Sequence, residues 1–380
     1  MERAYREADG WPGRVEKAIG ELFQAAIENP GAVRLSLLEI NALGAVGIER
    51  RERSSARYER FIRDAVQLAP GRGTVSDTVL KAIVGGLMRV LHRRVLRGEG
   101  AELLALVPDL VAWTTSYYPT PPALLGEPRR GASRNRERVA VPEGGRAPGT
   151  LAPHALLSRR RGLPRGDQNV SRSFVVHSQR ERVLDAVAKL TAANGYAELK
   201  VEEIAEDAAI SLNAFYEHFA DKEDAFLVAY ELGHAKALAT AERAYSSESE
   251  WPLAVQAGLA ALFEFLAAEP AFAHIALVDA LIATDRTAER SHAGVSAFAR
   301  MLVPGLEEAP KQSARPPVTI EAISGGVFEL CLRYAFAGRI RELPELTGAA
   351  TYVSLAPFLG SARAARVATS SRAKRVPDAV

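Results

Sequence analysis

The chain repeats itself at a fixed offset of 240 residues, and this repeat limits the possible folds more than any other feature of the sequence. The segment that begins at Glu2 returns without gaps from Glu242 onward. The repeated residues include Trp11-Pro12 with Trp251-Pro252, Leu22-Phe23 with Leu262-Phe263, Pro30 with Pro270, Gly85-Gly86 with Gly325-Gly326, Arg93 with Arg333 and Leu103 with Leu343. Chance matches would need gaps to stay in register, so the sequence predicts a duplicated domain spanning residues 2–118 in its first copy.

Each copy has the apolar spacing of helices. In the second copy, Pro252 suits a first helical turn and Pro270 ends the helix that follows. The apolar residues between them recur at steps of three and four: Val255, Leu259, Leu262, Phe263 and Leu266. The alternating pattern of strands is absent from both copies. We therefore expect an all-α protein in which each copy is a bundle of about five helices.

The two copies are separated by a basic segment at residues 119–177. It holds eleven arginines and no lysine against four acidic residues, and it contains Pro- and Gly-rich stretches. Because it has too few apolar residues to bury a core, we expect a linker. Its run Arg159-Arg160-Arg161 suits either a solvated linker or a basic arm on DNA. The tail at residues 361–380 is expected to be disordered for the same reason as the linker.

Residues 178–236 have no counterpart in the first copy. Ser178 and Glu181 have the spacing of a capping box, which predicts that a helix begins there, and Gly195 suits the left-handed position at its end. Two short helices are expected over residues 201–208 and 211–219, meeting at a tight corner.

Apolar side chains fall where the cores of these short helices would meet: Ile204, Ala208, Ile210, Phe215 and Phe219. Ser211 is expected to cap the second short helix, and Asp221 to cap a fourth helix. This arrangement is a helix-turn-helix. Its second helix would direct four residues toward the major groove: Leu212, Asn213, Ala214 and Tyr216.

This segment resembles the DNA-binding domain of TetR-family regulators. The resemblance is carried by Ile204-Ala205, Ala208, Ile210-Ser211, Phe215-Tyr216, His218-Phe219 and Lys222-Glu223. The bundle downstream, with its Trp-Pro start and Gly-Gly helix, is similar to the family's effector-binding and dimerisation domain. The resemblance implies the following layout: sensor copy 1 at residues 1–118, linker at 119–177, helix-turn-helix domain at 178–236, sensor copy 2 at 237–360 and tail at 361–380.

The resemblance also implies a ligand-responsive regulator, expected to be a repressor, with double-stranded operator DNA and a small apolar effector as partners. The expected DNA-binding residues are Lys200, Ser211, Leu212, Asn213, Ala214, Tyr216, His218 and Lys222. The helix N-terminus at Lys222 would hold a phosphate. The expected effector pocket includes Phe265, Phe272, His274, Phe298 and Phe328, although helical aromatics are more often simple core.

Three features differ from the family pattern. Lys200 stands where a threonine is usual, and Ala209 replaces the usual glycine of the turn, which would strain the corner by about 1 kcal/mol if the backbone there is left-handed. Copy 1 has no helix-turn-helix of its own. Its expected place lies upstream of Met1, so either the start codon is misassigned or the domain was lost.

Family members pair through the last two helices of the sensor domain. We therefore expect residues 74–98 and 101–118 to pack on residues 318–338 and 341–358 as an intrachain pseudo-dimer, with a homodimer as the alternative.

Other classes of protein leave no signature in the sequence. The single cysteine, Cys331, excludes an internal disulfide and every multi-cysteine metal site. No phosphate-binding loop, nucleophile elbow or H-E-x-x-H motif occurs, so we expect no enzyme, no cofactor and no metal. A charged N-terminus without an apolar run, and no stretch of membrane-spanning length, predict a cytoplasmic protein with no membrane partner. Because residues 178–236 are acidic, a ligand- or protein-binding module with weak or lost DNA binding remains the alternative.

Overall fold

The computed structural model describes residues 10–37, 44–69, 75–118, 120, 172–308 and 316–370. These residues form helices and contain no strand, which confirms the all-α class. Most of the expected linker, at residues 121–171, lies outside the described residues, as do residues 371–380 of the tail.

The N-terminal half is a bundle of helices around one apolar core. Its elements are α2 (Gly10–Glu28), α3 (Pro30–Leu37), α4 (Gly44–Val66), α5 (Asp77–Leu96), the 3-10 helix η2 (Gly100–Leu106) and α6 (Val107–Thr115). The apolar stripe of α2 is buried at Val15, Ala18, Ile19, Leu22, Phe23 and Ala26. This is the three- and four-residue spacing of a helix with one face in the core.

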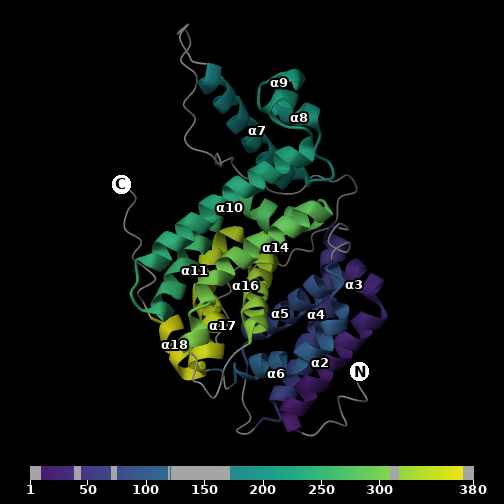
Figure 1. Cartoon of the computed structure of the whole chain (residues 1–380), viewed down its shortest axis with the longest axis vertical. Helices are drawn as coiled ribbons and strands as arrows, with labels where there is room; N and C mark the ends of the chain where they lie inside the picture. The colour runs from purple at the N-terminus through teal and green to yellow at the C-terminus, as the bar shows by residue number, and fades with distance from the viewer. Residues whose placement is uncertain are drawn as a thin grey trace, which may run out of the picture.

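The middle of the chain forms a separate small core. Its helices are α7 (Arg172–Asn194), α8 (Val201–Asp207), α9 (Leu212–His218) and the long α10 (Lys222–Ser246). Val183, Ile204, Phe215 and Phe226 are completely buried where these helices meet. In Figure 1, α7, α8 and α9 stand at one end of the molecule, and α10 runs from them along the C-terminal half.

The C-terminal half repeats the helices of the N-terminal half. It comprises α11 (Trp251–Ala268), α12 (Pro270–His274), the π-helix η4 (Ile275–Asp279), α13 (Ala280–Ile282), α14 (Asp285–Ala299), η5 (Arg300–Leu302), α15 (Gly305–Glu308), α16 (Pro317–Phe336), η7 (Ile340–Leu346), α17 (Thr347–Leu359) and α18 (Ser361–Ala368). Both ends of α16 and of η7 lie 240 residues after the ends of α5 and of η2, the offset of the sequence repeat.

The two halves meet along α5 and α16, which lie side by side in the centre of the molecule (Figure 1). A Cβ atom at Gly86 would overlap the carbonyl oxygen of Ala322, and one at Gly326 would overlap the carbonyl oxygen of Ala82. These two contacts are equivalent under the 240-residue offset. Such reciprocal contacts are those of an interface with twofold symmetry.

Hydrogen bonds extend the contact between the halves beyond α5 and α16. The Tyr117 hydroxyl donates to the Val353 carbonyl oxygen at 2.8 Å, and the Tyr352 hydroxyl donates to the Tyr117 carbonyl oxygen at 2.9 Å. At the edge of the interface, Glu321 pairs with both Arg93 (3.4 Å) and Arg94 (3.2 Å). The contact therefore combines close backbone packing with buried polar pairs.

The prediction that a helix begins at Ser178 is wrong, because α7 already begins at Arg172. In a capping box, the Glu181 side chain would accept a hydrogen bond from the backbone amide of Ser178. Instead it pairs with His177, one turn earlier on the helix, at 3.3 Å. Because α7 begins before Ser178, the Ser178 amide is already bonded within the helix and is not free for Glu181. The nearest partner for Glu181 is then the residue four positions earlier on the same helix.

The prediction of a disordered tail is wrong for residues 361–370. Gly360 turns the chain with a φ of 78°, and α18 follows. Ala364, Ala365 and Ala368 of α18 are buried against the rest of the C-terminal half, while Arg363 and Arg366 face solvent. Alanine has high helix propensity, and three alanines on one face give enough apolar surface for α18 to pack.

Among the residues that the structure describes, one helix has the length and apolar composition to cross a membrane, contrary to the expectation that no such stretch exists. This is α11, and 56% of its 18-residue window is buried inside the protein. It packs against α10, α17 and η7. A helix that is apolar on most of its surface and surrounded by other helices is a core helix of the bundle.

Candidate functional site

The corner between α8 and α9 depends on an alanine in the left-handed conformation. Ala209 has a φ of 52°, as predicted for the position of the usual turn glycine, and its side chain is exposed. The Ile210 amide donates to the Ala205 carbonyl oxygen at 3.0 Å, which closes the end of α8. Arg182 of α7 donates to the Ala209 carbonyl oxygen at 3.2 Å and fixes the corner on α7.

Helix α9 begins directly after this corner and presents its first turn to solvent. The Ser211 hydroxyl accepts a hydrogen bond from the Ala214 amide at 3.1 Å, so the predicted cap is confirmed. Phe215 is completely buried and fixes the inner face. On the outer face, Leu212 is 42% exposed and Tyr216 is 57% exposed, and Asn213 is exposed as well. The outer face of α9 is therefore a solvent-exposed surface rather than a core face.

The N-terminus of α10 is capped and tied to the C-terminal half. The Asp221 carboxylate accepts from the Asp224 amide at 2.8 Å, which confirms the predicted cap. One residue into the helix, Lys222 donates to three backbone carbonyl oxygens. Glu223 accepts a hydrogen bond from the Thr284 hydroxyl at 2.7 Å, so the start of α10 is held by the residue that caps α14.

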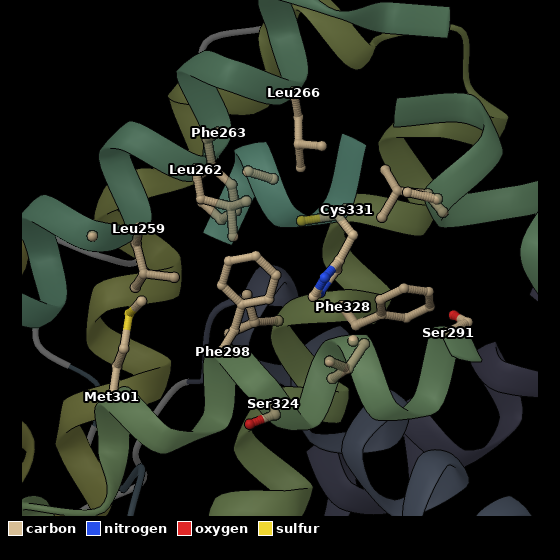
Figure 2. Close-up of a pocket in the computed structure, with 18 of the residues that line it drawn as sticks. Leu259, Leu262, Phe263, Leu266, Ser291, Phe298, Met301, Ser324, Phe328 and Cys331 are labelled. Carbon is tan, nitrogen blue, oxygen red and sulfur yellow. The ribbon is translucent and has the colours of Figure 1, made fainter. Parts of the chain in front are cut away.

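A cavity of about 130 Å³ lies inside the C-terminal half, enclosed by α10, α11, α14 and α16. Figure 2 shows Leu259, Leu262, Phe263 and Leu266 on one side and Phe298, Met301, Phe328 and Cys331 around the same space. No Asp, Glu, Lys or Arg belongs to its described lining. Burial raises the pKa of the Cys331 thiol to about 12, so this side chain is a neutral part of the wall.

Two elements belong both to this cavity and to the α7–α10 unit. On α10, Phe226 lies in the core of that unit, and one turn later Tyr230 and His234 line the cavity. In η4, Ile275 is part of the same core, and Leu277 lines the cavity. Helix α10 and η4 therefore join the wall of the cavity to the core of the α7–α10 unit.

A second cavity, of about 330 Å³, lies in the N-terminal half. Eight of its lining residues stand 240 positions before residues that line the first cavity: Leu22, Ala26, Ala32, Ser54, Ser55, Tyr58, Met88 and Leu91. It is more polar, because serines and Tyr58 replace the glycine, valine and Phe298 of the first cavity, and because Glu329 of α16 reaches its wall.

Residues 183–229, from α7 to the first part of α10, match the family described as bacterial regulatory proteins, tetR family. The chain therefore contains a TetR-type DNA-binding domain. The match covers the corner at Ala209, the α9 surface and the capped start of α10. No curated protein matches the chain.

Solved structures of TetR-type regulators resemble part of the chain. The fatty acid degradation regulator FadR of Bacillus halodurans is 16% identical, with 47% of this chain and 94% of that chain covered and a TM-score of 0.43. FadR of Bacillus subtilis, in complex with stearoyl-CoA, is 15% identical, with 46% and 96% covered and a TM-score of 0.41. A TetR-like regulator of Rhodococcus sp. RHA1 is 18% identical, with 47% and 96% covered and a TM-score of 0.33.

Three of the expected DNA-binding residues are engaged within the TetR-type domain. The Lys222 ammonium donates to the carbonyl oxygens of Leu199 (2.9 Å), Tyr196 and Ala197 (both 3.4 Å). His218 pairs with Gln179 at 3.3 Å, and Lys200 lies 3.7 Å from Glu203. Because an ammonium has three N–H groups, Lys222 has none left for a phosphate unless it exchanges a partner.

The expected pocket residues divide into two groups. Phe272, Phe298 and Phe328 line the cavity. Phe265 does not: it packs edge-on against Phe272, outside the cavity. His274 does not line it either, because its Nδ1 atom pairs with the buried Asp279 at 2.7 Å across the π-helix.

Several residues that line the cavity were not predicted from the sequence. Their spacing along α14 and α16 is the signal that identifies them. Phe328 lies on a face of α16 with Ser324, Val327 and Cys331, at steps of three and four. Ser291, Gly294, Val295 and Phe298 share one face of α14 in the same way. These neighbours are identified by starting from the predicted Phe298 and Phe328 and following steps of three and four residues along the same helix face.

Groups of histidine, cysteine and carboxylate side chains that would hold a metal ion are not found in the part of the chain that the structure describes. His218 and His274, the two histidines considered from the sequence, each pair with a single polar side chain instead.

Proposed function

We propose that this chain is a ligand-responsive repressor, acting in the cytoplasm, that binds operator DNA through α9 and is switched by a small apolar molecule in the cavity of the C-terminal half. The proposed layout keeps residues 178–236 as the DNA-binding domain, with residues 1–118 and 237–360 as the two sensor copies.

The observation that best supports this proposal is that α10 is one continuous helix. Its first turn caps and clamps the DNA-binding domain through Asp221 and Lys222, and its third turn supplies Tyr230 to the cavity wall. A helix is stiff over this distance, so displacement of Tyr230 by a ligand is transmitted to α9 as a rigid movement. This supports a single switch that joins ligand binding to DNA affinity.

The size of the cavity limits the ligand. An apolar cavity of about 150 Å³ takes one benzene molecule. The cavity here, at about 130 Å³ and without charged lining residues, fits an apolar group of similar size. A long acyl chain would need the helices around the cavity to separate.

We also propose that the two halves pair within one chain. In this family, two sensor domains pair in the same way, but they belong to two separate chains. The reciprocal contacts of Gly86 with Ala322 and of Gly326 with Ala82 support this proposal, as do the hydrogen bonds between Tyr117 and the C-terminal half. One chain then presents a single α9.

An electrophoretic mobility shift with fragments of the source genome tests DNA binding. We expect the wild-type chain to shift a subset of fragments, and Leu212→Ala with Tyr216→Ala to abolish the shift. Leu104→Ala is the matched control, because Leu104 is 43% exposed but lies on η2 of the N-terminal half. A wild-type chain that shifts no fragment would contradict the proposal in favour of a ligand- or protein-binding module.

A further inference from the structure

Arg89, on α5 of the N-terminal half, lies against the wall of the cavity in the C-terminal half. Its guanidinium carbon is 4.5 Å from the centre of the Phe328 ring, and Phe328 lines the cavity. Its side chain packs on Gly325, where a Cβ atom would overlap it. The charge of Arg89 also acts on Tyr230, another residue of the cavity wall. One half of the molecule therefore places a cation directly behind the cavity wall of the other half.

No described carboxylate lies within ion-pair distance of this cation, although the charges of Glu329 and Glu321 act on it. Arg89 forms no ion pair with the described residues, and its Nη2 atom is buried without a hydrogen-bond partner among them. The neighbouring Arg93 and Arg94 share Glu321, and Glu329 pairs with Arg333 at 3.1 Å. Leaving a buried guanidinium unpaired is costly, and groups of this kind are expected at sites that bind a ligand of opposite charge.

The charged groups around Arg89 carry both signs, since Arg93 is cationic whereas Glu329 and Glu321 are anionic. Burial lowers the pKa of Arg89 to about 10, so it stays charged at neutral pH. The pKa of His292, which follows Ser291 on α14, is lowered to about 2, first by burial and then by the charges of Arg89, His92, Arg93 and Arg97. The His92 and His292 rings are 5.3 Å apart between α5 and α14. The charges that act on His292, between α5 and α14, are thus cationic, and they would stabilise an anion there.

We propose that the effector is a small amphipathic carboxylate, with its apolar body in the cavity and its carboxylate bound by Arg89 at the Phe328 wall. This rests on the proposed function, since it identifies the ligand class of the same cavity. A planar guanidinium pairs with a carboxylate through two parallel hydrogen bonds. Phe328 lies between the cavity and Arg89, so its ring turns aside to admit the carboxylate.

The equivalent position of the other half has the opposite charge. Glu329 stands 240 residues after Arg89 and lines the cavity of the N-terminal half. A Cβ atom at Gly85 would overlap the Glu329 side chain, as one at Gly325 would overlap Arg89. In the second cavity this position therefore supplies a carboxylate that pairs with Arg333, where the first cavity has a guanidinium without an ion pair behind its wall. The chain should bind one carboxylate molecule, not two.

Isothermal titration calorimetry with the full chain tests this proposal. The probes are 3-phenylpropionate, 3-phenylpropanol and 3-phenylpropylamine at one ionic strength, because a benzene ring matches the cavity and the three head groups differ mainly in charge. We expect one 3-phenylpropionate molecule to bind per chain, about tenfold or more tightly than the alcohol, and the amine to bind most weakly.

Two variants of Arg89 then separate charge from packing. Arg89→Gln should lower the affinity for 3-phenylpropionate to that for 3-phenylpropanol and leave the alcohol unchanged, while Arg89→Lys should keep the preference for the acid. Arg363→Gln, an exposed arginine on α18, is the control and should change neither affinity.

The outcomes distinguish this inference from the function on which it rests. Equal affinity of the wild-type chain for the acid and the alcohol would overturn the role of Arg89 but leave the cavity as an effector site. A preference for the acid that persists in Arg89→Gln would overturn it as well. If none of the three probes binds, both the inference and the proposed apolar effector site fail.

Discussion

Ala209 holds the corner between α8 and α9 in a left-handed conformation that favours glycine. Ala209→Gly should therefore increase the free energy of unfolding by about 1 kcal/mol, because the side chain is exposed and no packing is lost. Urea unfolding followed by circular dichroism measures the change. Gly195→Ala is the reverse control: Gly195 has a φ of 81° and open space around it, so this change should destabilise by a similar amount. An unchanged or lower stability of Ala209→Gly would show that the corner is not strained.

At this scale, the sequence predicted what depends on a few neighbouring residues. The caps at Ser211 and Asp221 and the left-handed Gly195 follow from local rules and are confirmed. The pocket residues were harder to predict. The prediction that His274 lines the pocket is wrong because the π-helix that follows it turns its partner Asp279 toward it. Hydrophobic spacing contains no signal for such a turn. Phe265 failed for a simpler reason, since it lies off the face that Leu262 and Leu266 share.

At the scale of elements, Lys222 joins the start of α10 to the connection between α7 and α8. Its ammonium donates to three carbonyl oxygens there and lies 4.8 Å from the centre of the Tyr196 ring. Lys222→Met should lower the free energy of unfolding by about 1–2 kcal/mol, because three carbonyl oxygens, two of them part-buried, lose a charged donor. It should also speed amide hydrogen exchange in residues 195–200.

The matched control for Lys222→Met is Lys200→Met. The Lys200 side chain is 64% exposed and pairs only with Glu203, so its loss should change neither stability nor exchange. Stability of Lys222→Met equal to the wild type would mean that the lysine is free to contact DNA phosphate, as the sequence predicted.

The helices themselves were predictable where their apolar stripes face one core, and less so at their ends. The capping-box pattern predicts a helix start at Ser178, but the same pattern also occurs inside helices. Here Glu181 lies inside α7 and pairs with His177 instead. Helix α18 was missed because its buried face consists of alanines, which add little to a hydrophobicity pattern but pack closely.

At the scale of the whole molecule, the contact of α5 with α16 depends on residues without side chains. Gly86→Val should destabilise the protein by about 1–3 kcal/mol, because the new side chain would overlap the backbone at Ala322 and the Trp113 ring. Differential scanning calorimetry measures the loss. Gly20→Val controls for valine in a helix, since a Cβ atom at Gly20 meets nothing within 4 Å. Equal effects of the two substitutions would argue that the halves are not closely packed there.

The internal repeat was visible in the sequence because its register has no gaps, and helices recur in the structure at the same offset of 240 residues. What the sequence left open was how charges diverged between the copies. Arg89 and Glu329 occupy equivalent positions, but only the packing of α5 on α16 brings each one to the cavity of the other half. Contacts between distant segments of this kind have no local signal.

The central claim is that one chain, with its halves paired, presents a single recognition helix to DNA. In vitro selection with the purified full chain from a pool of random duplex DNA tests it most directly. We expect the enriched sequences to share one short motif without an inverted repeat, because a second α9 one helical turn away is needed to read a second half-site. Enrichment of an inverted repeat with half-sites about one turn apart, or of no sequence at all, would contradict it.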